Sequence, residues 1–316
     1  MKRKLIYSLA FLSLLVGASC ASKTNSDASN AADADGAVAA KEDILVGTLN
    51  VAVDASLLPL IKEQEEVFLS SYPNSKLNII ALPEIPAINT LLQNKAQVAI
   101  LTRELTVAEN ANFKDRSINP RIFPVAIDGI AFVSNVAAAD TSITFDSLFK
   151  AMRGQDIGGK TILFDNLNSS SFRQIKEIGK LDKVSGVKVA GKDNAAEVLA
   201  EVNNNANVIG VISYNDYLGL VDSFPNINNI RILSLQNTIG DKADGKFYKP
   251  SQSTLSTETY PLRRTVYVLN YQPNMGLGIG FSAFLTGDRG QRIVLKSGLL
   301  PATMPGREII IRDKVN

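Results

Sequence analysis

The 316-residue sequence predicts an α/β fold in which mixed sheets are flanked by helices. Two observations predict this class. Apolar segments with strand character alternate with segments of helical periodicity, and the chain has no internal repeat or coiled-coil heptad. Hydrophobic residues make up 45% of the chain and charged residues 20%, as in ordinary globular proteins, and the length is enough for two domains.

The first part of the predicted globular body, from residue 44, consists of strand–helix pairs. Alternating or continuous apolar residues predict strands over 49–53, 76–82 and 97–101. Apolar residues at helical spacing predict helices over 57–68 and 85–94. Thr106, followed three residues later by Glu109, forms a capping-box pattern that predicts the start of another helix. Strands that alternate with helices in this way favour parallel pairing.

The second part of the body continues the alternation. Four apolar segments predict strands: 161–164, 208–212, 230–235 and 266–269. Helical spacing predicts four helices, the first of them capped by Thr144: 144–152, 172–180, 278–285 and 291–297. Residues 241–257 are polar and rich in turn-forming residues, so no helix or strand is predicted there.

The composition excludes several classes of function. The chain has no His and a single Cys, Cys20, so it cannot form a His-based triad, a His-containing metal cluster, an intrachain disulfide or a Cys-rich zinc site. A formal charge of +2 is too balanced to indicate nucleic-acid binding. A Ser nucleophile would need Lys, Asp or Glu as its base, and no Ser-x-x-Lys pattern stands at a predicted turn. We therefore expect a binding protein without cofactor or metal, and not an enzyme.

The first 20 residues have the features of a secretory leader. Three basic residues at 2–4 precede an apolar run over 5–16, which is too short to span a bilayer. Small residues at 17–19 then lead directly to Cys20. This pattern is similar to a bacterial lipobox, although Gly17 stands where such motifs usually carry Leu. We expect lipidation of Cys20; the alternative is a plain secretory signal with an incidental Cys.

Residues 21–43 are predicted to be a disordered tether, because they are rich in Ala, Ser, Asp and Asn and contain Val38 as the one large apolar residue before residue 43. Removal of the leader takes away three basic residues, so 33 basic and 31 acidic residues become 30 and 31. An anchor, a tether and a nearly neutral body predict a monomer held at a membrane through Cys20, in the periplasm or cell envelope.

Small polar residues follow predicted strands and precede helices in three places. Ligands of open α/β sheets bind outside the carboxyl ends of the strands, and helix N-termini offer unpaired N–H groups to anions. Hydroxyl groups add donors without bulk. If the three places converge, they form a site for a small tetrahedral oxyanion from Ser56, Thr102, Arg103, Ser169, Ser170, Ser171 and Arg173.

Each of these residues also has a purely structural interpretation. Ser56 would be an ordinary N-cap, and residues 169–171 would be a polar loop with one cap. Arg173 would pair with Glu177 at i+4, and Arg103 would pair with the adjacent acidic residue on the surface. Only their joint occurrence after strands favours the anion-binding interpretation.

Asp128 lies in the otherwise apolar run 125–133. A buried charge is unfavourable unless it has a partner. The structural interpretation is a turn residue before Gly129. The functional interpretation is a carboxylate that accepts a hydrogen bond from a protonated oxyanion. Hydrogen phosphate carries such a proton near neutral pH and sulfate does not, so Asp128 would favour phosphate over sulfate.

Segments of the body, taken in order, resemble the phosphate-binding lipoproteins of bacterial phosphate ABC transporters, the PstS-like periplasmic binding proteins. The matching segments are 48–54, 102–106, 125–131, 168–171, 209–213, 260–264, 290–294 and 298–301. They follow the family's order over nearly the whole body.

The resemblance implies a two-lobed periplasmic binding protein (type II-like), in which each lobe is a mixed sheet flanked by helices and two crossing segments join the lobes. Lobe 1 would comprise 44–133 and 262–316, and lobe 2 would comprise 134–261. The lobes would close on inorganic phosphate and deliver it to an ABC transporter permease. The alternative is a binding or sensor module for another oxyanion or a phosphonate, not coupled to phosphate import.

The resemblance also implies roles for individual residues. Ser56 would donate to phosphate, residues 102–103 match a Ser-Arg pair, Asp128 matches the carboxylate that receives the phosphate proton, and residues 169–171 match a Ser-Gly-Thr turn. Two positions depart from the family. Asp165 stands where the family often has Arg, and Ser170 replaces the Gly of the turn. Arg103 and Arg173 are the candidates for the missing positive charge.

Overall fold

A ten-stranded sheet runs through residues 43–306, the part of the chain that the computed structural model describes. Its strands follow the order β2 (Ser75–Leu82), β1 (Gly47–Asp54), β3 (Val98–Leu101), β12 (Arg263–Asn270), β4 (Arg121–Asn135), β8 (Val208–Ser213), β6 (Thr161–Phe164) and β7 (Val189–Gly191). Both β9 (Ile230–Ile232) and β13 (Leu300–Pro301) pair with β4. A small second sheet joins β11 (Phe247–Tyr248), β10 (Ser234–Gln236) and β5 (Ser142–Ile143).

The 15-residue strand β4 connects two parts of the large sheet. It pairs antiparallel with β12 over its first part and with β8 over its last part. We call the part with β1, β2 and β3 the first half, and the part with β6, β7 and β8 the second half; within each, these strands pair in parallel. The predicted mixed sheet is confirmed. The predicted lobe boundaries stay a prediction; β4 itself continues without a break through residue 133, so the strand does not mark a boundary there.

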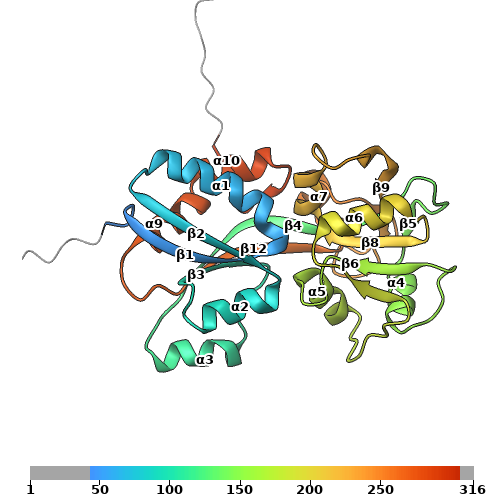
Figure 1. The fold of residues 1–316 in the computed structure, drawn as a ribbon, viewed down its shortest axis with the longest axis horizontal. Coiled ribbons are helices and arrows are strands. Elements are labelled where there is room, and N and C mark those ends of the chain that lie inside the picture. Colours follow the sequence, from blue (N-terminus) through green and yellow to red (C-terminus); the bar gives the residue numbers. More distant parts are fainter. Residues whose placement is uncertain (1–42, 307–316) are drawn as a thin grey trace, which may run out of the picture. The chain divides into compact units, whose positions relative to one another are not determined.

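Helices cover both faces of the first half (Figure 1). One face carries α1 (Leu58–Ser71), α9 (Leu277–Thr286) and α10 (Asp288–Lys296), and the other carries α2 (Glu84–Leu92) and α3 (Val107–Asp115). The alternation of β1 explains this, since Val51 and Val53 pack into the first core and Ala52 into the second. On α1, the buried ring of Phe68 packs edge-on against Phe281.

The second half is covered in the same way. The helices α4 (Phe145–Met152) and α5 (Ser170–Ile178) contribute to one core, and α6 (Ala195–Asn204) and α7 (Tyr214–Leu220) to the other. At Gly210 of β8, a Cβ atom would lie 2.6 Å from the side chain of Val198 and 2.7 Å from that of Val133. The close approach of α6 and β4 to β8 therefore requires glycine at this position.

Most predicted elements are confirmed. The strands expected over 49–53, 76–82 and 97–101 are β1, β2 and β3, and Thr106 and Glu109 form the predicted capping box of α3. The single strand predicted over 230–235 is wrong, because it is divided between β9 and β10, which belong to different sheets.

Three helices were not predicted: α6, α7 and the short α8 (Gln252–Ser256). The last lies in the segment expected to contain no element. Its local pattern is weak, because Leu255 is its one buried residue, but Ser251 and Thr254 form a capping box at its start.

Several sequence-based predictions fall outside the described residues. These are the leader over 1–20, the lipidation of Cys20, the tether up to residue 42, and residues 307–316 of the predicted first lobe. Within residues 43–306, the helices are all too short or too polar to cross a membrane.

Candidate functional site

The buried Arg264 is the centre of a polar network between the two halves. Its side chain is 2% exposed, and that of its partner Asp128 is 0% exposed. The Nε and Nη2 atoms of Arg264 donate to Oδ2 of Asp128 at 3.0 and 2.8 Å. The pair forms because β12 and β4 place these two residues directly opposite each other. Two hydrogen bonds between opposite charges compensate much of the loss of hydration.

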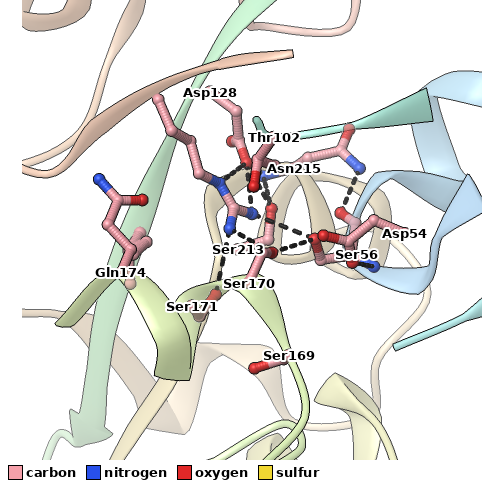
Figure 2. Close-up of polar contacts among 12 residues, drawn as sticks. Asp54, Ser56, Thr102, Asp128, Ser169, Ser170, Ser171, Gln174, Ser213 and Asn215 are labelled. Carbon is pink, nitrogen blue, oxygen red and sulfur yellow. Dashed lines mark hydrogen bonds and ion pairs between the residues drawn. The ribbon is translucent and has the colours of Figure 1, made fainter. Parts of the chain in front are cut away.

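Three serine hydroxyls complete the surroundings of the guanidinium. Nη2 of Arg264 donates to Ser56 Oγ at 3.1 Å, and Nη1 donates to Ser170 Oγ at 2.7 Å and Ser171 Oγ at 3.4 Å. Ser56 lies in the 3-10 turn η1 (Ala55–Leu57) of the first half, whereas Ser170 and Ser171 begin α5 in the second. Figure 2 shows Ser56 and Ser170 facing each other, with their Oγ atoms 3.5 Å apart.

Asp128 has further donors at the start of α7. Ser213 Oγ donates to its Oδ2 at 2.7 Å, and the backbone N–H of Asn215 donates to its Oδ1 at 3.1 Å. The amide Nδ2 of Asn215 donates in turn to the backbone carbonyl of Ser56 at 2.9 Å. The turn interpretation of Asp128 is wrong, because the residue lies within β4. Acceptance of a phosphate proton stays a prediction; in this arrangement Asp128 holds Arg264.

The structure thus brings Ser56, Asp128, Ser170 and Ser171 together around one cation. The interpretation of Ser56 as an N-cap is wrong, since Asp54 accepts from the backbone N–H at the start of η1. The expected convergence of strand ends and helix starts therefore occurs for the three serines, which Asp128 joins from within β4.

Three of the other predicted anion-binding side chains gather around the fully buried Glu84, the first residue of α2. Thr102 Oγ1 donates to Glu84 Oε2 at 3.1 Å, and Arg103 Nε donates to Oε1 at 3.3 Å. From the second half, Arg173 Nη2 donates to Oε2 at 3.0 Å. One carboxylate therefore ties arginines of both halves together.

Each of these two arginines has a second acidic partner. Arg103 donates to both carboxylate oxygens of Glu109, at 2.8 and 2.9 Å, and this hydrogen bonding lowers the pKa of Glu109 to about 2. Arg173 pairs with Glu177 at 2.7 Å, which confirms the predicted i+4 pair. The expected side-chain pair of Arg103 with Glu104 is wrong, because Arg103 donates to the backbone carbonyl of that residue.

Arg264 was not among the predicted site residues, although it lies in the matched segment 260–264. It supplies the positive charge next to the serines, while Arg103 and Arg173 are held at Glu84. The signal in the sequence was an arginine at the start of an apolar strand. Its partner, however, is 136 positions away, so the sequence alone did not reveal the pair.

A cavity of about 60 Å³ lies beside this network. Ser56 lines the cavity and also bonds to Arg264, so the two features are adjacent. The cavity has an acidic lining, to which Asp54, Asp165, Asp193 and Asp216 contribute; none of its lining residues within 43–306 is Lys or Arg.

Ser169 lines this cavity, and Figure 2 draws it apart from the contacts that join Ser56, Ser170 and Ser171. Its hydroxyl donates to Asp165 Oδ1 at 2.8 Å and accepts from the backbone N–H of Phe172 at 3.3 Å, so Ser169 is the N-cap of α5. Burial raises the pKa of Asp165 to about 6, against the opposing hydrogen bond from Ser169.

Two more carboxyl groups at the cavity have raised pKa values. Asp54 is 1% exposed; its Oδ1 accepts from the Ser56 N–H at 3.1 Å, whereas its Oδ2 has no hydrogen-bond partner among the described residues. Burial raises the pKa of Asp54 despite the nearby charge of Arg264. Burial also raises the pKa of Asp216 well above its ordinary value, and the charges of Asp165 and Asp128 add to this.

The described part of the chain contains no group of three or more His, Cys, Asp or Glu side chains that could hold a metal ion. The acidic residues of the cavity are therefore not arranged as a metal centre.

Replacement of Arg264 should strongly destabilise the fold. Arg264→Gln leaves Asp128 buried without its cation, and we expect the free energy of unfolding to fall by about 3–5 kcal/mol, measured by urea unfolding. Arg263→Gln is the matched control, because its side chain is 30% exposed and pairs with the half-exposed Glu258. We expect a loss below about 1 kcal/mol for the control. Similar losses in the two variants would contradict the structural role of Arg264.

The raised pKa of Asp165 predicts a pH dependence of stability. The folded protein binds this proton more tightly than the unfolded chain, so the free energy of unfolding falls as the pH rises from 3.8 to about 6. Asp165→Asn keeps an acceptor for Ser169 and removes the titration. We expect a shallower pH slope and a gain of up to about 3 kcal/mol at pH 7 in urea unfolding. Asp193→Asn, at an exposed position on the same cavity, serves as control. An unchanged slope in Asp165→Asn would refute this assignment.

Comparison with known proteins places the fold in a family. Residues 37–289 match the model of a PBP superfamily domain. The structure is similar to that of a Clostridium perfringens protein named as a phosphate ABC transporter substrate-binding protein, which was solved with bound phosphate. The TM-score is 0.65 and the identity 15%, and the match covers 81% of this chain and 100% of that one. It is also similar to an ABC-type phosphate transport receptor from Vibrio cholerae, with a TM-score of 0.61, 19% identity and coverage of 81% and 100%. At these identities the likeness concerns the fold. No curated protein matches the sequence. The family model covers most of the chain, and the protein therefore belongs to the PBP superfamily.

Proposed function

We propose that this protein is an extracytoplasmic solute-binding protein that captures inorganic phosphate or a closely related phosphorus oxyanion between its two halves, for delivery to an ABC transporter. One observation carries the proposal. Hydroxyls from both halves, Ser56 on one side and Ser170 and Ser171 on the other, converge on the buried cation Arg264. Membership of the PBP superfamily and the names of two similar structures support it.

The chemistry of these groups suits a tetrahedral oxyanion. The guanidinium of Arg264 and the serine hydroxyls are donors, and α5 begins at Ser170 with backbone N–H groups that favour negative charge. The Oγ atoms of Ser56 and Ser170 are 3.5 Å apart and belong to different halves. The N–H groups of Arg264 already have partners, so an oxyanion bound by both serines would replace the Ser56–Ser170 contact and the contacts of Arg264 with these serines. It would then bridge the halves, so binding would be coupled to their relative motion.

Finer parts of the proposal rest on the sequence. They are the secretory leader over 1–20, lipidation of Cys20, a monomeric state, a location in the periplasm or cell envelope, and the lobe boundaries after residues 133 and 261. The preference of Asp128 for a protonated phosphate over sulfate is also a proposal from the sequence; it would require a phosphate oxygen to join the donors that Asp128 already has, among them Arg264. The proposal includes no catalytic step.

The alternative, a binding or sensor module for another oxyanion or a phosphonate, is favoured by one observation. The cavity beside Ser56 is lined by four aspartates and by no Lys or Arg among the described residues. A site for inorganic phosphate alone does not need four carboxyl groups beside it. A phosphonate with a second functional group would use both the Arg264 network and the acidic cavity.

Titration calorimetry tests the proposal. We expect the protein to bind inorganic phosphate and to bind sulfate at least about tenfold more weakly. Ser170→Ala removes a hydroxyl from the convergence point and should weaken phosphate binding about tenfold, since it deletes the hydrogen bond that this hydroxyl would donate to the anion. Ser253→Ala, at an exposed position of α8, should leave the affinity unchanged. Absence of binding of both phosphate and phosphonates would refute the proposal, and equal loss in both variants would exclude this location.

A further inference from the structure

The acidic cavity has room for a small chemical group. Its volume of about 60 Å³ corresponds to about four water-sized groups, since one such group needs roughly 15 Å³. Ser56 is one of its lining residues and also contacts Arg264. A solute whose oxyanion is bound at Arg264 could therefore extend a short substituent past Ser56 into the cavity.

The acidic lining of the cavity indicates the charge of that substituent. Asp54, Asp165 and Asp216 line it from three different elements or loops, and no Lys or Arg within residues 43–306 belongs to its lining. A negative group placed here would face these carboxylates directly, and an apolar group would separate them further from water. A positive group with several N–H donors would satisfy them.

One oxygen atom of a residue that lines the cavity lacks a hydrogen-bond donor. Oδ2 of Asp54 has no hydrogen-bond partner in the described structure, although the residue is almost completely buried. A buried carboxylate oxygen without a donor is unfavourable. A primary ammonium group carries three donors, enough for one hydrogen bond to each of Asp54, Asp165 and Asp216.

We propose that the solute of this protein carries an ammonium group beside its phosphorus oxyanion, as in an aminoalkyl phosphonate or phosphate monoester. The ammonium group enters the cavity among Asp54, Asp165 and Asp216, while Arg264, Ser56 and Ser170 hold the oxyanion. This inference rests on the proposed function and narrows its substrate class.

Two observations support an ammonium group over other positive ligands. The acidic side chains do not form an arrangement that could hold a metal ion. Burial raises the pKa values of Asp54, Asp165 and Asp216, as expected for carboxyl groups without a counter-ion inside the cavity. A bound ammonium group would supply that counter-ion and make their ionised forms favourable.

The test compares three probes by titration calorimetry on the full chain: inorganic phosphate, ethylphosphonate and 2-aminoethylphosphonate. The last two differ only by the amine. We expect 2-aminoethylphosphonate to bind at least about tenfold more tightly than ethylphosphonate, because charge-assisted hydrogen bonds of the amine add to binding.

Variants locate the effect in the cavity. Asp216→Asn should reduce the ratio of the two phosphonate affinities to about one or two, and Asp165→Asn should lower it in the same direction. Asp146→Asn, whose side chain is 73% exposed on α4, should keep the wild-type ratio.

The outcomes separate this inference from the proposed function. If the wild-type protein binds phosphate but binds ethylphosphonate as tightly as 2-aminoethylphosphonate, the inference is wrong and the proposed function stands. An amine preference that persists in both aspartate variants also overturns it. If none of the three probes binds, the proposed function and the inference fail together.

Discussion

The ion pair between Arg264 and Asp128 is the constraint on which the rest of the site depends. Two opposite charges are buried where β12 and β4 run side by side, and burial is tolerated only if nearly every donor and acceptor of the pair is satisfied. The donors and acceptors that do this come from η1, α5 and α7. The pair therefore fixes where three helical segments of two different halves begin.

A second buried charge organises the neighbouring contact between the halves. Glu84 is fully enclosed and accepts hydrogen bonds from Arg103 in the first half and Arg173 in the second. Since both arginines also pair with Glu109 and Glu177, their charges are neutralised locally. The cation next to the serines is Arg264, whose charge Asp128 balances, and the cavity beside it keeps its acidic character.

Local features of the chain were predictable from the sequence, and long-range pairs were not. The alternation of Val51, Ala52 and Val53 identifies β1 and even its two faces, and the Thr106–Glu109 capping box identifies the start of α3. Helices whose stability comes from tertiary packing, such as α7 and the five-residue α8, lack such a local signal.

The same distinction holds for the candidate site. Placement of polar residues after strands correctly selected Ser56, Ser170 and Ser171 as neighbours, because the carboxyl ends of strands meet at one edge of a sheet. The identity of the central cation depended on the register between β12 and β4, and the role of Arg103 and Arg173 depended on Glu84. Neither the register nor a buried acid from another element has a signature in a single sequence.

A crystal structure of the protein grown with inorganic phosphate tests the central claim most directly. The account predicts phosphate oxygens within hydrogen-bond distance of Arg264, Ser56 and Ser170, with the Arg264–Asp128 pair intact. Phosphate bound instead to Arg103 and Arg173, with the carboxylate of Glu84 displaced, would contradict it.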